Sequence, residues 1–129
     1  MMDNSDLTEI QANAIEAPPA WALMERQLID FMESLGIQKV DLGLPGAGPF
    51  HIGHIDAMLS HMGDNGYALR PGCAVRTVVS DIEPLVDLQA KHERQIQASA
   101  FLGTSPIRQY AEGWTMEKIL STAEKAVSF

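Results

Sequence analysis

Two charged side chains interrupt apolar runs in this sequence, and both could contribute to a binding site. Asp41 lies within the run 37–44, and Arg76 lies within the run 73–79. An unpaired charge on an apolar strand is costly to bury, so each group needs a partner, a ligand or water. The two could form an ion pair between neighbouring strands. Alternatively, both could point into a pocket, with Arg76 facing a carboxylate and Asp41 facing a substrate or a metal shell. The two interpretations are compatible.

Histidine and cysteine, the other residue types that often carry chemistry, form no clear motif. His51 and His54 are three residues apart, a spacing that could hold a metal ion on one helix. No third ligand is obvious beyond Asp56 or His61, and the sequence has no HExxH motif. Surface or helix-start positions are therefore the favoured interpretation of these histidines. The single cysteine, Cys73, lies in an apolar run and is expected to be a buried structural thiol.

Helices and strands that could position these groups alternate along the chain. We expect helices at residues 4–17, 20–36, 50–63, 81–92 and 116–127, and strands at residues 37–44, 73–79 and 96–103. Strands that alternate with helices pair in parallel through right-handed crossovers, and ligands bind at the C-terminal ends of such strands. Unusual polar residues gather after each strand, in the loop 43–49, around 76–81 and in 103–109. The sequence therefore predicts an α/β fold with a site at that edge.

Hydrophobic periodicity predicts which helix faces are buried. In helix 20–36 the apolar residues spaced by three or four are Trp21, Met24, Leu28, Phe31, Met32 and Leu35. In helix 50–63 the same spacing selects Ile55, Met58, Leu59 and Met62. Ser80 or Asp81 is expected to cap the helix 81–92, with Pro84 in its first turn, and Thr115 to cap the last helix.

The composition limits the class of protein. A chain of 129 residues with 46% hydrophobic and 20% charged residues is typical of one globular domain. A net charge of −8 without a basic stripe disfavours nucleic acid as a partner. No apolar stretch approaches the ~20 residues that a membrane-spanning helix needs. The N-terminus lacks the pattern of a signal peptide, so we expect a cytoplasmic protein that does not bind membranes.

Three segments together resemble the pyruvate-carboxyltransferase-like domain of 2-isopropylmalate and homocitrate synthases. They are LGIQKVDLGLPGAGP, AVRTVVSDIEPL and ASAFLGTSPIRQYAEGWTMEKILSTAEKAV. Family members typically read L-G-[IV]-x-x-I-E-x-G-[FL]-P-x-x-[SG]-P on one strand. They continue with an arginine-containing strand followed by Asp-Ile, and with Thr-Ser at the end of a third strand. The resemblance covers about residues 21–129, and the wider group of metal-dependent TIM barrels includes 3-hydroxy-3-methylglutaryl-CoA lyase and 4-hydroxy-2-oxovalerate aldolase.

The resemblance implies a condensing enzyme in which a divalent metal polarises a 2-oxo acid and acetyl-CoA supplies the carbon nucleophile. Asp41 takes the place of the family's acidic strand residue, which is usually Glu, and Arg76 matches the arginine of the next strand. Thr104 and Ser105 match the Thr-Ser pair near the substrate and the acyl-CoA. Arg108 is a further candidate for binding an anionic group. These five residues are the expected substrate-binding residues.

The chain also departs from the family pattern. The family's first strand carries a metal-binding Asp and a catalytic Arg in D-x-T-L-R-D-G, and nothing before Trp21 matches it. The family's His-x-His metal ligands are likewise absent, and a barrel needs eight strands and ~250 residues where we expect three strands. We therefore assign no catalytic or metal-binding residue and expect no metal to bind this chain alone.

The expected fold is a partial TIM barrel of about three parallel β/α units at 18–129, preceded by N-terminal helices and an extension at 1–17. The expected function is a fragment of an acyl-CoA-dependent condensing enzyme that is inactive alone. A fragment of a related lyase or aldolase, or a non-catalytic binding or assembly module, remains an alternative. Because bare sheet edges favour association, we expect self-association or a complementary barrel fragment as partner.

Overall fold

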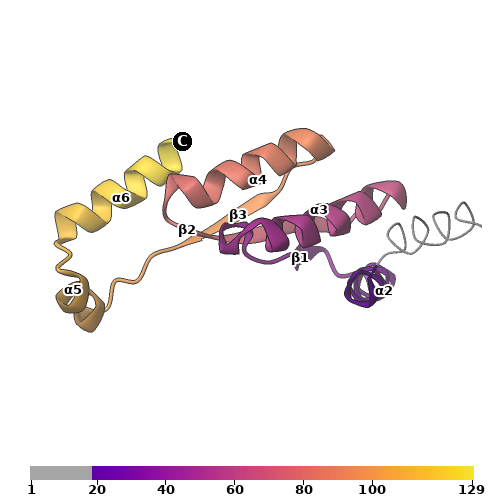
Figure 1. Cartoon of the computed structure of the whole chain (residues 1–129), viewed down its shortest axis with the longest axis horizontal. Helices are drawn as coiled ribbons and strands as arrows, with labels where there is room; N and C mark the ends of the chain where they lie inside the picture. Colours follow the sequence, from indigo (N-terminus) through magenta and orange to yellow (C-terminus); the bar gives the residue numbers. More distant parts are fainter. Residues whose placement is uncertain (1–18) are drawn as a thin grey trace, which may run out of the picture.

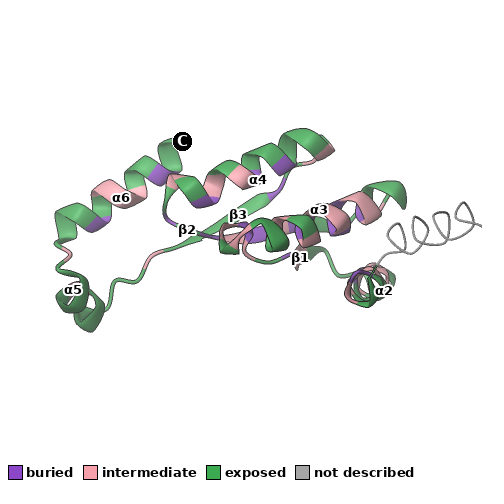
Figure 2. Ribbon diagram, in the orientation of Figure 1, coloured by how far each residue is buried: buried purple, intermediate pink, exposed green. Residues whose placement is uncertain are grey.

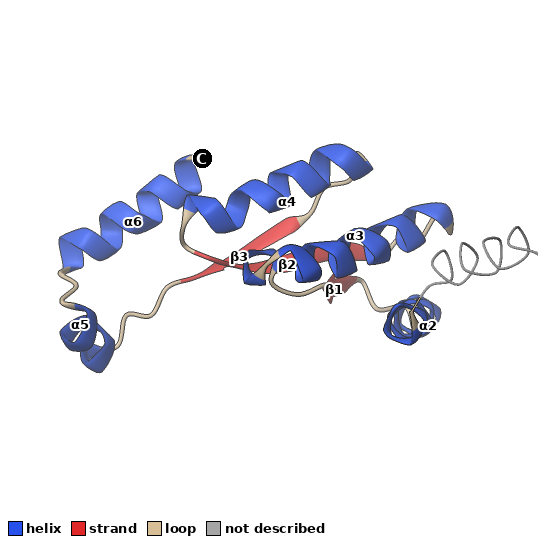
Figure 3. Ribbon diagram, in the orientation of Figure 1, coloured by secondary structure: helices blue, strands red, loops and turns tan. Residues whose placement is uncertain are grey.

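Helices cover one face of a three-stranded parallel sheet in the computed structural model, which describes residues 19–129 (Figures 1 and 3). Along the chain the elements are α2 (Ala20–Ser34), β1 (Lys39–Asp41), η1 (Pro45–Ala47), α3 (Pro49–Asp64), β2 (Arg70–Arg76), α4 (Val79–His92), β3 (Gln97–Phe101), α5 (Pro106–Glu112) and α6 (Met116–Ser128). The predicted α/β class is therefore confirmed. The expected helix 4–17 and the extension 1–17 lie outside the described residues.

The sheet has the strand order β1-β2-β3, and both strand pairs are parallel, as predicted. Ala74 of β2 lies opposite Ser99 of β3. Side chains of β2 alternate in exposure, so that Cys73 and Val75 are buried toward the helices while Arg76 is exposed. All five residues of β3 are exposed (Figure 2). No described element covers the second face of this sheet. This is unusual, because both faces of a parallel sheet are normally covered.

The hydrophobic core lies between the sheet and the helices α3 and α4. The buried face of α3 consists of Ile55, Met58, Leu59 and Met62, which confirms the prediction from periodicity. Leu85 and Leu88 of α4 pack into the same cluster. Each large apolar side chain buried here contributes ~1.5–3 kcal/mol before the entropy of ordering it is subtracted. Since α3 and α4 also contact each other, they lie side by side on the same face.

Helix α2 packs against α3 through a different face from the predicted one. Its fully buried residues are Ala22 and Ile29. Four residues that the periodicity assigned to the core are each at least 60% exposed, namely Met24, Leu28, Phe31 and Leu35. Trp21 and Met32, also predicted to be buried, are half-buried. The inward face carries Glu25 and Asp30, which bind histidines of α3, and this polar contact turns the apolar stripe outward.

The boundaries of β2 and α4 differ from the prediction. The predicted strand 73–79 begins three residues earlier, at Arg70, and ends at Arg76. The strand ends there because the chain turns, with the Val78 N–H donating to the Arg76 carbonyl over 2.7 Å. Helix α4 therefore begins at Val79, and Pro84 lies inside the helix rather than in its first turn. No side chain caps this helix, so the expected cap by Ser80 or Asp81 is wrong.

The C-terminal part contains one helix that was not predicted. Helix α5 occupies a segment expected to be a loop, and it begins with Pro106 after a Ser105 cap. It lies beyond an extended segment that leads away from the sheet (Figure 1). Helix α6 agrees with the prediction, including its cap, in which the Thr115 hydroxyl accepts a hydrogen bond from the Lys118 N–H over 3.2 Å. Within residues 19–129, no helix is long and apolar enough to cross a membrane.

Candidate functional site at the C-terminal ends of the strands

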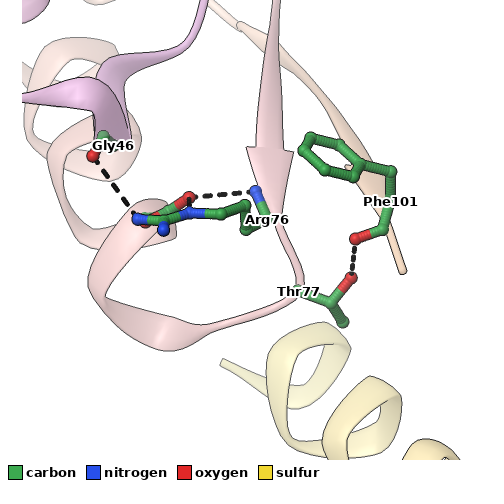
Figure 4. A network of polar contacts seen from close by, with 5 residues as sticks. Gly46, Arg76, Thr77 and Phe101 are labelled. Carbon is green, nitrogen blue, oxygen red and sulfur yellow. Dashed lines mark hydrogen bonds and ion pairs between the residues drawn. The ribbon is translucent and has the colours of Figure 1, made fainter. Parts of the chain in front are cut away.

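The best-defined polar network joins the end of β2 to the first turn of α4 (Figure 4). Arg76 donates from Nε to Asp81 Oδ2 and from Nη2 to Asp81 Oδ1, both over 2.7 Å. The Arg76 backbone N–H also donates to Asp81 Oδ2, over 3.0 Å. The Asp81 side chain is 2% exposed, whereas that of Arg76 is 56% exposed. Asp81 is therefore a buried acceptor that fixes the orientation of a partly exposed guanidinium.

This pairing shifts the pKa of both groups. The hydrogen bonds from Arg76 lower the pKa of Asp81, against the opposing effect of burial. The same hydrogen bonds raise the pKa of Arg76. Both side chains are consequently charged at neutral pH. The bonds use Nε and Nη2, so Nη1 carries no bond in this network and can donate to an anionic group outside the protein.

The glycine–proline loop closes over this ion pair. Gly46 lies in η1, and its carbonyl oxygen is 3.5 Å from Arg76 Nη2. A Cβ atom on Gly46 would lie only 2.3–2.5 Å from the carboxylate atoms of Asp81. Only glycine fits at this position without movement of the carboxylate. The loop therefore needs glycine because the chain passes directly above a buried acid.

Asp41 is not the partner of Arg76, so the predicted ion pair between them is wrong. The side chain of Asp41 is exposed on the uncovered face of the sheet, opposite to Val40 and Leu42, because side chains alternate along a strand. Its Oδ1 accepts a hydrogen bond from the Gly43 N–H over 2.9 Å. Gly43 has a φ of 121°, which β-carbon-bearing residues rarely adopt. Asp41 thus stabilises the turn after β1 with one oxygen, and its side chain is exposed.

A second contact ties the ends of β2 and β3 together. The Thr77 hydroxyl donates to the Phe101 carbonyl oxygen over 2.6 Å, and Thr77 itself is buried (Figure 4). This bond satisfies a carbonyl at the end of an edge strand. It also fixes the point from which the chain leaves the sheet toward α5.

Thr104, Ser105 and Arg108 lie away from Asp41 and Arg76, on the segment that carries α5 (Figure 1). Ser105 caps α5 by accepting a hydrogen bond from the Arg108 N–H over 3.2 Å. The Thr104 carbonyl oxygen accepts from Gln109 Nε2 over 2.8 Å. The Arg108 guanidinium lies 5.8 Å from the centre of the Trp114 ring. In this arrangement the three residues stabilise the local helix, and only Asp41 and Arg76 of the expected set end adjacent strands.

The histidines form pairs with carboxylates between helices. His54 Nδ1 lies 2.7 Å from Glu25 Oε1, and the ring stacks on Trp21 with centroids 3.5 Å apart. His61 Nε2 lies 2.6 Å from Asp30 Oδ1, which also accepts from the Tyr67 hydroxyl over 2.6 Å.

The last such pair joins α4 to α3. His92 Nε2 lies 2.6 Å from Asp56 Oδ1. Among residues 19–129, no three His, Cys, Asp or Glu side chains converge to hold a metal ion. The histidines with carboxylate partners join α2, α3 and α4.

Cys73 is fully buried, and burial raises its pKa to about 12. The thiol is therefore protonated at neutral pH and cannot act as a nucleophile or a metal ligand in the folded chain. This agrees with the prediction of a structural thiol.

A surface groove lies elsewhere, between α3 and α4. Its volume is 540 Å³, and Asp56, Glu83, Asp87 and Lys91 are among its lining residues. It opens on the helical side, so it does not include the strand ends where Asp41 and Arg76 lie. The Asp56 carboxylate in this groove is already bound to Lys91 and His92, so it is not available to a ligand.

Sequence reasoning missed Asp81, Thr77 and Gly46 as members of this network. Asp81 follows the strand end by five residues, and its position near the strand's C-terminal edge was a usable signal. Gly46 had no such signal, because its contact is with a residue 35 positions later, which only the folded chain brings near. Comparisons with protein-family models, curated proteins and solved structures found no match to this chain.

Proposed function

We propose that this chain is one section of a (β/α) barrel of the kind that the 2-isopropylmalate and homocitrate synthases have. In this proposal the section belongs to an acyl-CoA-dependent enzyme that condenses a 2-oxo acid with acetyl-CoA, and it is inactive by itself. Its location would be the cytoplasm. The single observation that carries the proposal is the pair of charged residues, Asp41 and Arg76, at the C-terminal ends of adjacent parallel strands.

The arrangement of layers supports this proposal. The strands follow one another in chain order, and the helices α3 and α4 between them lie on one face only. A barrel section has this arrangement, because the other face of its sheet lines the barrel interior. A doubly wound fold would instead place helices on both faces. Both outer edges of the sheet, along β1 and β3, lack a neighbouring strand among residues 19–129.

The two charged residues would have different roles. Arg76 would present Nη1 to the carboxylate of a 2-oxo acid, since Asp81 already holds the rest of the guanidinium in place. Asp41 would accept a hydrogen bond from the substrate on the same face. Thr104, Ser105 and Arg108 could join them only if the segment that carries α5 packed back toward the strand ends.

The divalent metal of the resembled family does not fit the described residues. The site offers Asp41 and the buried Asp81, whose two oxygens are bound to Arg76, and no convergent third ligand within residues 19–129. In this proposal the metal ligands belong to strands that pair with the free edges of β1 and β3.

The experiment that tests the proposal joins this chain to whatever coding sequence flanks it. The joined protein is assayed for release of free CoA from acetyl-CoA in the presence of 2-oxo acids and Mg²⁺ or Mn²⁺. We expect condensation that Arg76→Ala weakens strongly and that the control Lys125→Ala leaves unchanged. Cleavage of a hydroxy acid in place of condensation would indicate the alternative of a related lyase or aldolase. Flanking sequence without a metal-binding strand, together with no activity in either direction, would contradict both.

One observation favours a non-catalytic assembly module as a second candidate. The apolar stripe on α2 (Met24, Leu28, Phe31 and Leu35) is exposed, and Met116, Leu120 and Val127 of α6 are exposed as well. Monomeric proteins rarely leave such large apolar surfaces bare. Under both candidates these surfaces contact either a second copy of the chain or a complementary set of strands and helices. A self-associated chain that folds cooperatively alone, and that takes up neither substrate nor metal when joined to its flanking sequence, would favour the module over the enzyme.

A further inference from the structure

A pocket with a volume of 470 Å³ lies at the N-terminal end of the sheet, opposite to the ends that carry Asp41 and Arg76. It is lined by Lys39, Arg70, Pro71, Arg94, Gln95 and Gln97. A smaller pocket of 170 Å³ adjoins it and shares Lys39, Arg70 and Gln97 with it. The smaller pocket extends over Gly72 to Ser99 on the uncovered face and is also lined by Asp41, which the larger pocket does not contact.

The larger pocket is basic although the chain is acidic. Three of its lining residues are Lys or Arg, and none is Asp or Glu. The whole chain has only 9 Lys and Arg residues and a net charge of −8. Lys39 and Arg70 are also direct partners in the β1–β2 register, and both are exposed. Like charges at facing positions of neighbouring strands repel each other, so this pair destabilises the sheet unless an anion lies between them.

The structure provides little to offset this repulsion. Neither Lys39 nor Arg70 belongs to an ion pair within the described residues. Arg70 Nη2 reaches the neutral oxygen Oε1 of Gln38, at the long distance of 3.5 Å. Asp41 is the one acid that lines the smaller pocket, and one of its oxygens is bound to the Gly43 N–H.

Arg94 contributes a third positive charge that is held in a fixed position. Its Nη2 donates to the carbonyl oxygens of Tyr67 over 2.8 Å and Leu69 over 2.5 Å. These acceptors are neutral, so they orient the guanidinium without cancelling its charge. Gln95 and Gln97 line the same pocket and bring amide N–H groups that can donate to an anion.

We propose that this basic pocket binds a small organic anion through a carboxylate or phosphate group that lies between Lys39 and Arg70. Its volume is within the roughly 300–1,000 Å³ range of small-molecule sites, so it can hold more than an inorganic ion. The site is separate from the one proposed at the C-terminal ends of the strands and does not depend on it.

The proposal is tested by calorimetric titration of the full chain at low ionic strength. Succinate and inorganic phosphate serve as the two probes, and they distinguish a carboxylate site from a phosphate site. We expect saturable binding of at least one probe with one anion per chain. Lys39→Gln and Arg70→Gln should each weaken it about tenfold, because each removes a charged donor. The control Lys125→Gln removes the same charge from α6 and should leave the affinity unchanged.

Melting temperatures of the same variants without ligand give a second measurement. Because Lys39 and Arg70 repel each other, Lys39→Gln should melt at the same temperature as the unchanged chain or a higher one. Loss of binding together with retained stability supports a ligand site. Equal weakening in all three variants would show general charge attraction and overturn the proposal. Absence of saturable binding by both probes, or a strongly lowered melting temperature in Lys39→Gln, would also overturn it.

Discussion

Replacing Gly46 with alanine should destabilise the protein through the buried carboxylate of Asp81. The new Cβ would lie 2.3–2.5 Å from the carboxylate atoms, far inside van der Waals contact. Asp81 cannot move away freely, because three hydrogen bonds from Arg76 hold it. Either the carboxylate shifts and loses these bonds, or the loop 45–47 lifts off and exposes Pro45, which is fully buried.

The expected loss of unfolding free energy is about 2–3 kcal/mol. Breaking a fully buried ion pair costs about 3–5 kcal/mol, and the half-exposed Arg76 can recover part of this from water. The assay is urea unfolding followed by circular dichroism, at one protein concentration, with the slope of the transition checked for constancy. For a domain of this size, a loss of 2–3 kcal/mol lowers the melting temperature by roughly 10 °C.

Gly53→Ala is the matched control, since a Cβ at Gly53 would meet nothing within 4 Å. Gly53 lies inside α3, where alanine is the better helix former, so this substitution should stabilise the protein by up to about 1 kcal/mol. A further control repeats Gly46→Ala in an Asp81→Ala background, where the clash is gone and the added cost should be small. The reasoning is refuted if Gly46→Ala is harmless, or if its cost is the same in both backgrounds.

Three other predictions concern charge, burial and association. Because the pKa of Asp81 is lowered in the folded chain, its ionised carboxylate stabilises the fold above about pH 4. This contribution is lost as the pH falls through the lowered pKa. Asp81→Asn should therefore make the unfolding free energy less dependent on pH in the acid range. An unchanged pH dependence in Asp81→Asn would contradict this prediction. Cys73, with a pKa raised to about 12, should react with iodoacetamide at pH 8 only when the chain is unfolded in urea. Rapid reaction of the folded chain would argue against the burial of Cys73. Light scattering should show that the chain self-associates through the exposed apolar residues of α2. Leu28→Glu or Phe31→Glu should reduce the association, whereas Gln27→Glu should not. A monomeric unchanged chain that melts cooperatively would exclude an interface at these residues.

Much of the fold follows from local patterns. The four buried residues of α3 all agree with the helical period, and Thr115 caps α6 as its residue type predicts. The three strands and their parallel pairing follow from the alternation of elements. The run from Cys73 to Val79 was misleading, because β-branched residues favour strands whether or not a neighbour is available. At the end of β2 the Val78 N–H donates to the Arg76 carbonyl and the Arg76 N–H donates to the Asp81 carboxylate, and strand propensity predicts neither contact.

The orientation of α2 and the presence of α5 could not be predicted from hydrophobic periodicity alone. Periodicity shows that α2 has an apolar stripe, but it does not show which neighbour the stripe meets. In the structure the polar residues Glu25 and Asp30 face α3 because histidines are placed to receive them. Helix α5 was missed although Ser105, Pro106 and Gly113 mark its start and end, because seven residues are too few for periodicity to be recognised.

The positions of Asp41 and Arg76 in the sheet agree with the sequence prediction, but the predicted ion pair between them is wrong. Arg76 lies at the C-terminal edge of the sheet, as predicted, and Asp41 is exposed on the face away from the helices. The choice of partner was wrong because a sequence does not show whether a nearer acid exists in the fold. Asp81, five residues from Arg76, accepts hydrogen bonds from Nε and Nη2 of the guanidinium, and Asp41 instead stabilises the turn after β1.

The close approach of Gly46 to Asp81 also limits how this sequence can vary. A side chain at position 46 and an acid at position 81 exclude each other in space, although 34 residues separate them along the chain. Related sequences that retain the acid should therefore retain glycine, and those that lose the acid should be free to accept larger residues at position 46. A larger residue at position 46 is therefore disfavoured until position 81 loses its acid, so changes at the two positions would be expected to be correlated.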